Sequence, residues 1–179
     1  MFLDSTYFQG DLYLPNLKIQ SGTAGVAAML QAVGENTLEW YVDRYEREFL
    51  DRLLGQKLAR AFVDGMRQEE PEARWTALKE RIYRKERFSY SPAANYVFYW
   101  LSRRGRTQTS MHGEVRATED HSRIVSDGNK LVWAWNDLIP QVKEIRQYLS
   151  DNWSLYQADA DEWTCICRER FLPINTFNL

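Results

Sequence analysis

The sequence predicts a mainly α-helical bundle in a single domain, residues 1–179, with extended arms at both ends and one long polar, hairpin-like excursion. Three observations lead to this fold class. Apolar residues recur at steps of three and four over most of the chain, as they do on one face of a helix. Residues typical of helix starts and stops flank these stretches. Glycine and proline are sparse, at nine and five residues, which argues against disorder over most of the length.

The first 22 residues are expected to form an extended arm. Their apolar residues are interrupted by Gly10, Pro15 and Asn16, which break regular structure. An arm of this kind cannot fold alone. It should therefore lie against the body of the subunit or against a neighbouring molecule.

The helical body is expected to cover residues 23–150. A short helix at Ala24–Val33 opens it. Asn36 and Glu39 then form a capping-box pattern at the start of a longer amphipathic helix, which ends at Gly55. Further amphipathic stretches follow at residues 56–66, 75–82, 92–104 and 131–149.

The helix after Ser91 has the clearest boundaries. Ser91 is a good N-cap, and Pro92 falls in the first turn, where its missing N–H has no effect. Arg103 and Arg104 lie in the last turn, where positive charge is favourable, and Gly105 provides a left-handed stop.

A polar excursion, residues 106–129, separates this helix from the last one and contains almost no core-forming residues. Compact domains rarely contain such a long polar loop unless it has a function. The last helix carries an apolar seam from Leu131 to Leu149, and Pro140 is expected to kink it. Residues 151–179 include an alternating stretch rich in strand formers, so we expect a strand-like C-terminal tail.

Composition excludes several classes of protein. The net charge of −2 excludes a globally basic nucleic-acid binder. No run of about 20 apolar residues is present to span a membrane, and the N-terminus lacks the basic and apolar regions of a signal peptide. Cys165 and Cys167 are too close in sequence to bond each other readily. We therefore expect a reducing compartment, the cytoplasm, and no membrane partner.

Motifs of enzyme chemistry are missing from the sequence. It has no phosphate loop, dinucleotide fingerprint, HExxH zinc motif or GxSxG nucleophile turn. His112 and His121 could join Cys165 and Cys167 as zinc ligands or as a thiol–imidazole pair, but their spacing matches no usual zinc pattern. We expect no catalytic residue, no metal and no cofactor, and a thiol enzyme or hydrolase built on these residues is the least favoured alternative.

A group of carboxylates between residues 43 and 51 also needs an interpretation. Asp43, Glu46, Glu48 and Asp51 alternate with arginines along one predicted helix. Opposite charges three and four residues apart are typical of a solvated helix face. We therefore interpret this group as surface and not as acid–base machinery.

The basic residues are mostly arginine, and the chain has seven tryptophans and ten tyrosines. These residue types are enriched at binding surfaces. The cluster Arg103–Arg106 opens the polar excursion and is followed by hydroxyl and amide side chains. That combination suits contacts to a phosphate backbone, whereas the alternative is simple helix capping by Arg103 and Arg104.

Three blocks, at residues 41–55, 91–115 and 130–138, resemble small virion proteins of tailed bacteriophages and prophages, especially of Bacteroidetes hosts. Those proteins are similar to head–tail connector, or head-completion, proteins of the neck. The matching positions are Tyr45, Glu46, Phe49, Leu50, Leu53, Leu54, Gly55, Ser91, Pro92, Ala94, Asn95, Tyr96, Val97, Thr107, Gln108, Thr109, Gly113, Glu114, Val115, Ala134, Trp135 and Asn136. The C-terminal third matches no block.

The resemblance implies a mainly helical subunit that forms a homo-oligomeric ring between the portal protein and the tail or a second neck protein. Double-stranded DNA would pass through the lumen without sequence specificity, and the subunit would assemble in the host cytoplasm into the virion neck. A closed ring repeats one heterologous contact, so an arm and its acceptor must be different surfaces. The resemblance also implies no cofactor and no turnover.

On this basis we expect contacts with DNA or between subunits at Arg103, Arg104, Arg106 and Arg116. We expect the arms to contact neighbours through Phe2, Tyr7, Phe8, Phe171 and Phe177. The main alternative is a cytoplasmic helical adaptor of bacterial origin, with no virion role, that binds proteins through a face rich in tryptophan and tyrosine.

Overall fold

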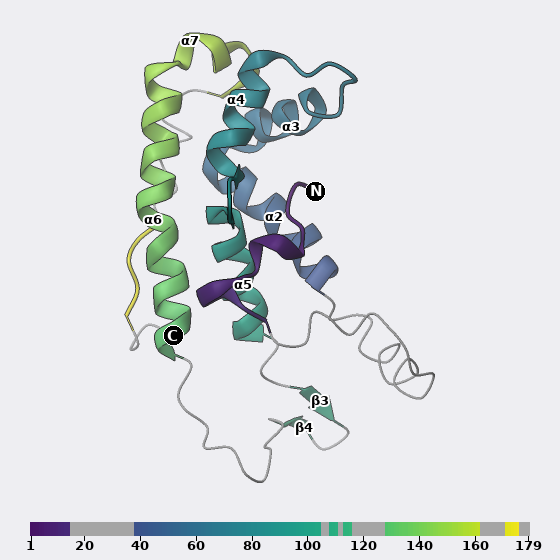
Figure 1. Cartoon of the computed structure of the whole chain (residues 1–179), viewed down its shortest axis with the longest axis vertical. Helices are drawn as coiled ribbons and strands as arrows, with labels where there is room; N and C mark the ends of the chain where they lie inside the picture. Colours follow the sequence, from purple (N-terminus) through teal and green to yellow (C-terminus); the bar gives the residue numbers. More distant parts are fainter. Residues whose placement is uncertain (15–37, 105–107, 111–112, 116–127, 162–170, 176–179) are drawn as a thin grey trace.

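The fold is described by a computed structural model that covers residues 1–14, 38–104, 108–110, 113–115, 128–161 and 171–175 (Figure 1). The helices in these ranges are α2 (Leu38–Leu54), α3 (Gln56–Gly65), α4 (Ala73–Ile82), α5 (Pro92–Arg104), α6 (Gly128–Asp151) and α7 (Trp153–Tyr156). The expected mainly α-helical bundle is confirmed. Helix Ala24–Val33 and the Asn36 cap were expected at positions outside the described residues.

Helix α5 is the centre of the bundle and packs against α2 and α6 (Figure 1). All residues from Ser91 to Tyr99 are buried, so the first two turns of this helix are covered on every side. That burial explains its aromatic composition, because a helix without a solvated face has no need of polar residues. Tyr96 packs against Phe49 of α2 at 5.6 Å and Trp135 of α6 at 5.8 Å between ring centroids, which joins the three helices.

Gly55 separates α2 from α3 as expected. Its φ of +79° lies in the left-handed region that glycine adopts without strain. A second close approach occurs at Gly65, where a Cβ atom would lie 2.3 Å from Nε1 of Trp75. Helices α3 and α4 can therefore approach each other only if residue 65 has no side chain.

Two short antiparallel hairpins complete the described secondary structure. Strands β1 (Arg84–Lys85) and β2 (Ser89–Tyr90) join α4 to α5. Strands β3 (Gln108–Ser110) and β4 (Gly113–Val115) pair within the polar excursion, as its hairpin-like character predicted. Figure 1 shows β3 and β4 beyond the C-terminal end of α5.

Helix α6 begins at Gly128, so it includes the last two residues of the predicted excursion, and it continues through Pro140 as one element. The prediction of a strand-like tail from residue 151 is wrong for its first part. Helix α7 and a 3-10 turn at Gln157–Asp159 follow α6 directly. The buried Tyr156 explains this course, since its hydroxyl donates to the Arg74 carbonyl at 2.9 Å and fixes α7 against α4.

The prediction of an extended N-terminal arm also needs correction. The described part, residues 1–14, contains 3-10 turns at Ser5–Tyr7 and Gly10–Leu12. Leu3, Tyr7 and Phe8 are buried in the core of their own subunit. The segment therefore folds back onto the bundle because its apolar side chains fill that core.

Candidate functional site

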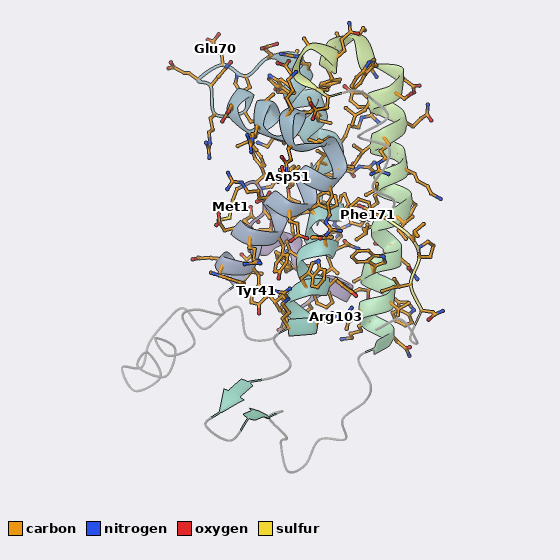
Figure 2. All side chains as sticks on the ribbon, turned by 180° about the vertical axis from the view of Figure 1, so that it is seen from behind. Met1, Tyr41, Asp51, Glu70, Arg103 and Phe171 are labelled. Atoms are coloured by element: carbon orange, nitrogen blue, oxygen red, sulfur yellow. The ribbon has the colours of Figure 1, made fainter. Side chains whose placement is uncertain are left out.

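The first candidate surface is the basic–aromatic end, formed by the first turns of α2 and the last turn of α5. Its members are Trp40, Tyr41, Arg44, Tyr45, Tyr99, Trp100, Arg103 and Arg104. In Figure 2, Tyr41 and Arg103 lie at the same end of the bundle, and Glu70 lies at the opposite end.

Arginines at this end lie over aromatic rings. The Arg104 guanidinium is 5.2 Å from the ring centre of Trp100 and 5.6 Å from that of Tyr45. Arg44 approaches Tyr45 at 5.7 Å. Arg103 lies over the ring of Tyr99 and donates to its hydroxyl. These contacts orient the charges by cation–π attraction while the side chains remain exposed.

Among the described residues, neither Arg103 nor Arg104 forms an ion pair with a carboxylate. Their N–H donors therefore remain available for an anionic group, such as a phosphate or a carboxylate of another molecule. The helix-capping alternative for these residues receives no support from their ring contacts. Arg106 and Arg116, predicted for the same surface, lie outside the described residues.

The second candidate surface is a groove between the N-terminal segment and α6, with a volume of about 580 Å³. We call it the N-terminal groove. Its lining residues are Tyr7, Gln9, Asp11, Leu12, Ser89, Tyr90, Ser91, Asn95, Lys130, Trp133, Ala134, Asn136, Asp137 and Pro140.

Asn95 connects α5 to α6 at this groove. Its side-chain amide donates to the Ala134 carbonyl at 3.0 Å and to Oδ2 of Asp137 at 3.1 Å. The Tyr90 hydroxyl donates to the same Oδ2 at 3.4 Å. Burial, followed by the nearby Asp137 charge, raises the pKa of Tyr90 to about 12, so this hydroxyl stays protonated at neutral pH.

The first residues of the N-terminal segment are held on α2 by a buried carboxylate. Glu46 is only 2% exposed and accepts hydrogen bonds from the backbone amides of Phe2, at 3.0 and 3.2 Å, and Leu3, at 3.2 Å. Burial raises the pKa of Glu46, although the Tyr83 hydroxyl and these amides partly oppose that shift. The interpretation of Glu46 as a surface carboxylate is therefore wrong.

A signal for this role was present in the sequence. Glu46 falls on the apolar stripe of α2, between Val42 and Phe49 at helical spacing. A carboxylate on such a stripe must be buried. Its partners come from residues more than 40 positions away, and the local pattern gives no hint of them.

Ring contacts of the arms are made within the subunit. Tyr7 and Phe8 are buried in the core, and Phe2 packs on Phe62 at 5.3 Å. Phe171 packs on Phe49 at 5.8 Å, beside α6 in Figure 2. Tyr7, Phe8 and Phe171 fill the core of their own subunit, which does not favour the expected contact with a neighbouring subunit, whereas Phe2 packs on that core and is only partly buried. Phe177 lies outside the described residues.

The segment after Phe171 is fixed to α6 by polar contacts. The Trp135 indole donates to the Leu172 carbonyl at 2.8 Å. Asn136 bonds the backbone of Ile174 twice, at 2.9 Å each, as donor and as acceptor. No strand is assigned in residues 171–175, and the alternating stretch behind the strand-like prediction lies almost entirely outside the described residues.

Other predicted site residues are not placed by the structure. His112, His121, Cys165 and Cys167 all lie outside the described residues. Within the described ranges, no group of three or more histidine, cysteine, aspartate or glutamate side chains is arranged to hold a metal ion. In the same ranges, no helix is long and apolar enough to cross a membrane.

Comparisons with known proteins give no relative for this arrangement. No protein-family model matches the chain, and no curated protein or solved structure matches it either.

Proposed function

We propose that this chain is a structural connector subunit of a tailed-bacteriophage or prophage virion. It assembles into a ring between the portal protein and the tail or a second neck protein, and DNA passes through the lumen. The subunit works by contact with copies of itself and with its neighbours in the neck. This role needs no cofactor and no turnover.

The observation that carries the proposal is the basic–aromatic end. Arg103 and Arg104 are exposed there, lie near aromatic rings and have no carboxylate partner among the described residues. The β3–β4 hairpin lies beyond the same end of α5 (Figure 1). A surface of this kind suits contact with DNA phosphates or with a carboxylate of the adjacent subunit.

Contacts between the resembling blocks support the proposal. Asn95, from the second block, donates to the Ala134 carbonyl in the third. Tyr45, from the first block, lies 6.4 Å from the Tyr96 ring of the second. Residues that match the connector pattern therefore include those that join α2, α5 and α6.

Electron microscopy of the purified protein, alone and mixed with portal protein, tests the ring directly. We expect closed rings in at least the mixture. Strictly monomeric particles in both samples would contradict the proposal. Gene order provides an independent test, since portal, capsid and tail genes should flank the gene.

The arginine surface is tested by replacing Arg103, Arg104 and Arg106 together with alanine in the virus. We expect reduced ring assembly or reduced genome retention. The matched control is Arg67→Ala, because the Arg67 side chain is 74% exposed in the turn after α3 and, among the described residues, pairs only with Asp64 three positions earlier. Normal infectious particles from the triple variant would contradict the assignment of these arginines.

A second candidate function is that of a helical adaptor without a virion role. The N-terminal groove favours it, since Trp133 is 64% exposed at its edge, where a peptide could cover it. Bacterial genes other than virion genes around this one, together with the absence of rings, would favour the adaptor.

A further inference from the structure

Two buried polar atoms in the walls of the N-terminal groove have no hydrogen-bond partner among the described residues. They are Oδ1 of Asn95 and the hydroxyl oxygen of Tyr7, and both residues are 2% exposed. Buried polar atoms in native proteins almost always have partners. The amide of Asn95 is fixed by its bonds to α6, so its Oδ1 cannot turn to find one elsewhere.

The charges around the groove favour a cation. Asp11 and Asp137 contribute two carboxylates, whereas Lys130 contributes the single ammonium group among the lining residues. The hydrogen bonds to Asp137 from Asn95, Tyr90 and Gln141 all use Oδ2. Oδ1 of Asp137 therefore keeps its lone pairs for a further donor.

The groove therefore offers acceptors for which the described residues supply no donor. Asn95 Oδ1 and Asp137 Oδ1 accept no hydrogen bond from these residues, and Asp11 adds an exposed carboxylate to the lining. A guanidinium group carries five N–H donors in a planar fork, one positive charge and no acceptor. An ammonium group carries three donors on one atom and lacks this planar fork, so it matches a carboxylate with less geometric specificity.

An apolar surface at the edge of the groove suits the methylene stem of an arginine side chain. Trp133 is 64% exposed. Pro140 also lines the groove and lies seven residues, or about two helical turns, further along α6. Guanidinium groups stack on tryptophan, and the methylene stem of arginine covers apolar surface. The volume of about 580 Å³ is within the range of ordinary ligand pockets.

We propose that the N-terminal groove binds an arginine side chain carried by a peptide segment of a different protein. The guanidinium donates to Asp137 and towards Asn95 Oδ1, while the flanking peptide crosses Trp133. This binding is a property of a single subunit, so it does not depend on ring formation or on a virion role.

The test uses the full chain, labelled with ¹⁵N, and arginine capped as N-acetyl-arginine N-methylamide. We expect shifts confined to the Trp133 indole, the Asn95 side-chain amide and their neighbours. Capped citrulline has the same shape with a neutral ureido group, and we expect it to bind about tenfold more weakly, because charge-assisted hydrogen bonds are lost. Capped lysine should also bind more weakly.

Three variants test whether the capped arginine binds in the N-terminal groove. Asp137→Asn keeps an acceptor for Asn95 and removes the charge, and we expect binding to weaken about tenfold. Asp11→Asn provides a second variant at an exposed position, with a smaller loss in the same direction. Glu70→Gln is the matched control at the opposite end of the bundle (Figure 2) and should leave binding unchanged. Thermal unfolding of each variant verifies that the fold is intact.

Three outcomes would overturn the proposal. Equal binding of capped citrulline or capped lysine would exclude recognition of the guanidinium. Shifts that avoid the groove resonances would exclude the site. Shifts of the same groove resonances on raising protein concentration alone, lost in Asp137→Asn, would identify a second copy of this chain as the occupant.

Discussion

The N-terminal end of α5 places Ser91 and Asn95 at 1% and 2% exposure, whereas its C-terminal end leaves Arg103 and Arg104 exposed. At the first end, polar groups are fixed by hydrogen bonds to α6 and to the helix itself. At the second end, charges lie over rings, and apart from the Arg103 donor bound to the Tyr99 hydroxyl their N–H groups have no side-chain partner among the described residues. Polar residues on one helix thus stabilise the fold at one end and offer a binding surface at the other.

The largest expected effect concerns the core that joins the two ends. Tyr96→Ala should lower the free energy of unfolding by about 3–5 kcal/mol, because a large buried ring is removed from contact with α2 and α6. Urea unfolding followed by circular dichroism measures this loss. Tyr96→Phe is the matched control and should lose only about 1 kcal/mol, from the hydroxyl bond to Glu48. Similar losses for both variants would place the stabilisation in the hydroxyl and not in the ring.

The next largest loss of stability is expected at the buried N-terminal end of α5. Asn95→Ala should lower the free energy of unfolding by about 2 kcal/mol, because it leaves the Ala134 carbonyl without this donor and removes a bond to Asp137. Ser102→Ala, on the partly exposed last turn of the same helix, should change it by less than about 0.5 kcal/mol. If the two substitutions had equal effects, the contrast between the ends of α5 would disappear.

Loss of the helix cap should have a smaller effect. In Ser91→Ala, the Ala93 amide loses its side-chain acceptor at 3.2 Å. We expect a loss of about 1 kcal/mol in the free energy of unfolding. Ser91→Asn retains a capping oxygen and should recover part of the loss, so failure of this rescue would show that volume and not capping determines the effect.

The buried carboxylate of Glu46 should make the free energy of unfolding depend on pH. Its folded-state pKa is raised above the unfolded value of about 4.5, so protonated Glu46 stabilises the fold below that pH. This contribution is lost as the pH rises through the folded-state pKa. Glu46→Gln keeps an acceptor for the Phe2 and Leu3 amides and does not titrate.

Relative to the wild type, Glu46→Gln should therefore gain stability as the pH increases from about 4.5 towards neutrality. Urea unfolding at several pH values measures the difference between the two proteins. A difference that is constant with pH, or that changes in the opposite direction, would contradict the raised pKa.

The smallest effect per residue is expected at the exposed end. Replacing Arg103 or Arg104 singly with alanine removes cation–π contacts that contribute about 0.5–1 kcal/mol at an exposed site. Calorimetry should show only a small change in the melting temperature. A loss as large as that of Asn95→Ala would mean that these arginines are structural, which would contradict their proposed role in binding.

The helices could be predicted from the sequence because their signals are local. Ser91, Pro92, Gly55 and the apolar stripes gave the boundaries of α2 and α5 within the described residues. The structure of the C-terminal tail could not be predicted in this way, because it depends on distant partners. Tyr156 reaches the Arg74 carbonyl 82 residues away, and no periodicity within the tail indicates that contact.

For the same reason, one candidate surface was expected from the sequence and the other was not. The arginines at the end of α5 are consecutive in sequence and were identified. The N-terminal groove was not predicted, since it combines the N-terminal segment, β2, α5 and α6. Asn95 and Asp137 are 42 positions apart, and only the packing of α5 on α6 brings their side chains together.

The burial of residues 91–99 also constrains the order in which the polypeptide can fold. During synthesis α2 is made before α5, but α6 is made only after residue 128. Until then, the Ser91–Tyr99 stretch lacks one of the two helices that bury it. A nascent chain that pauses between these points exposes a ring-rich helix to chaperones and to other unfinished chains. Expression of fragments that stop before α6 should consequently give insoluble material, even though most of the helices are already encoded.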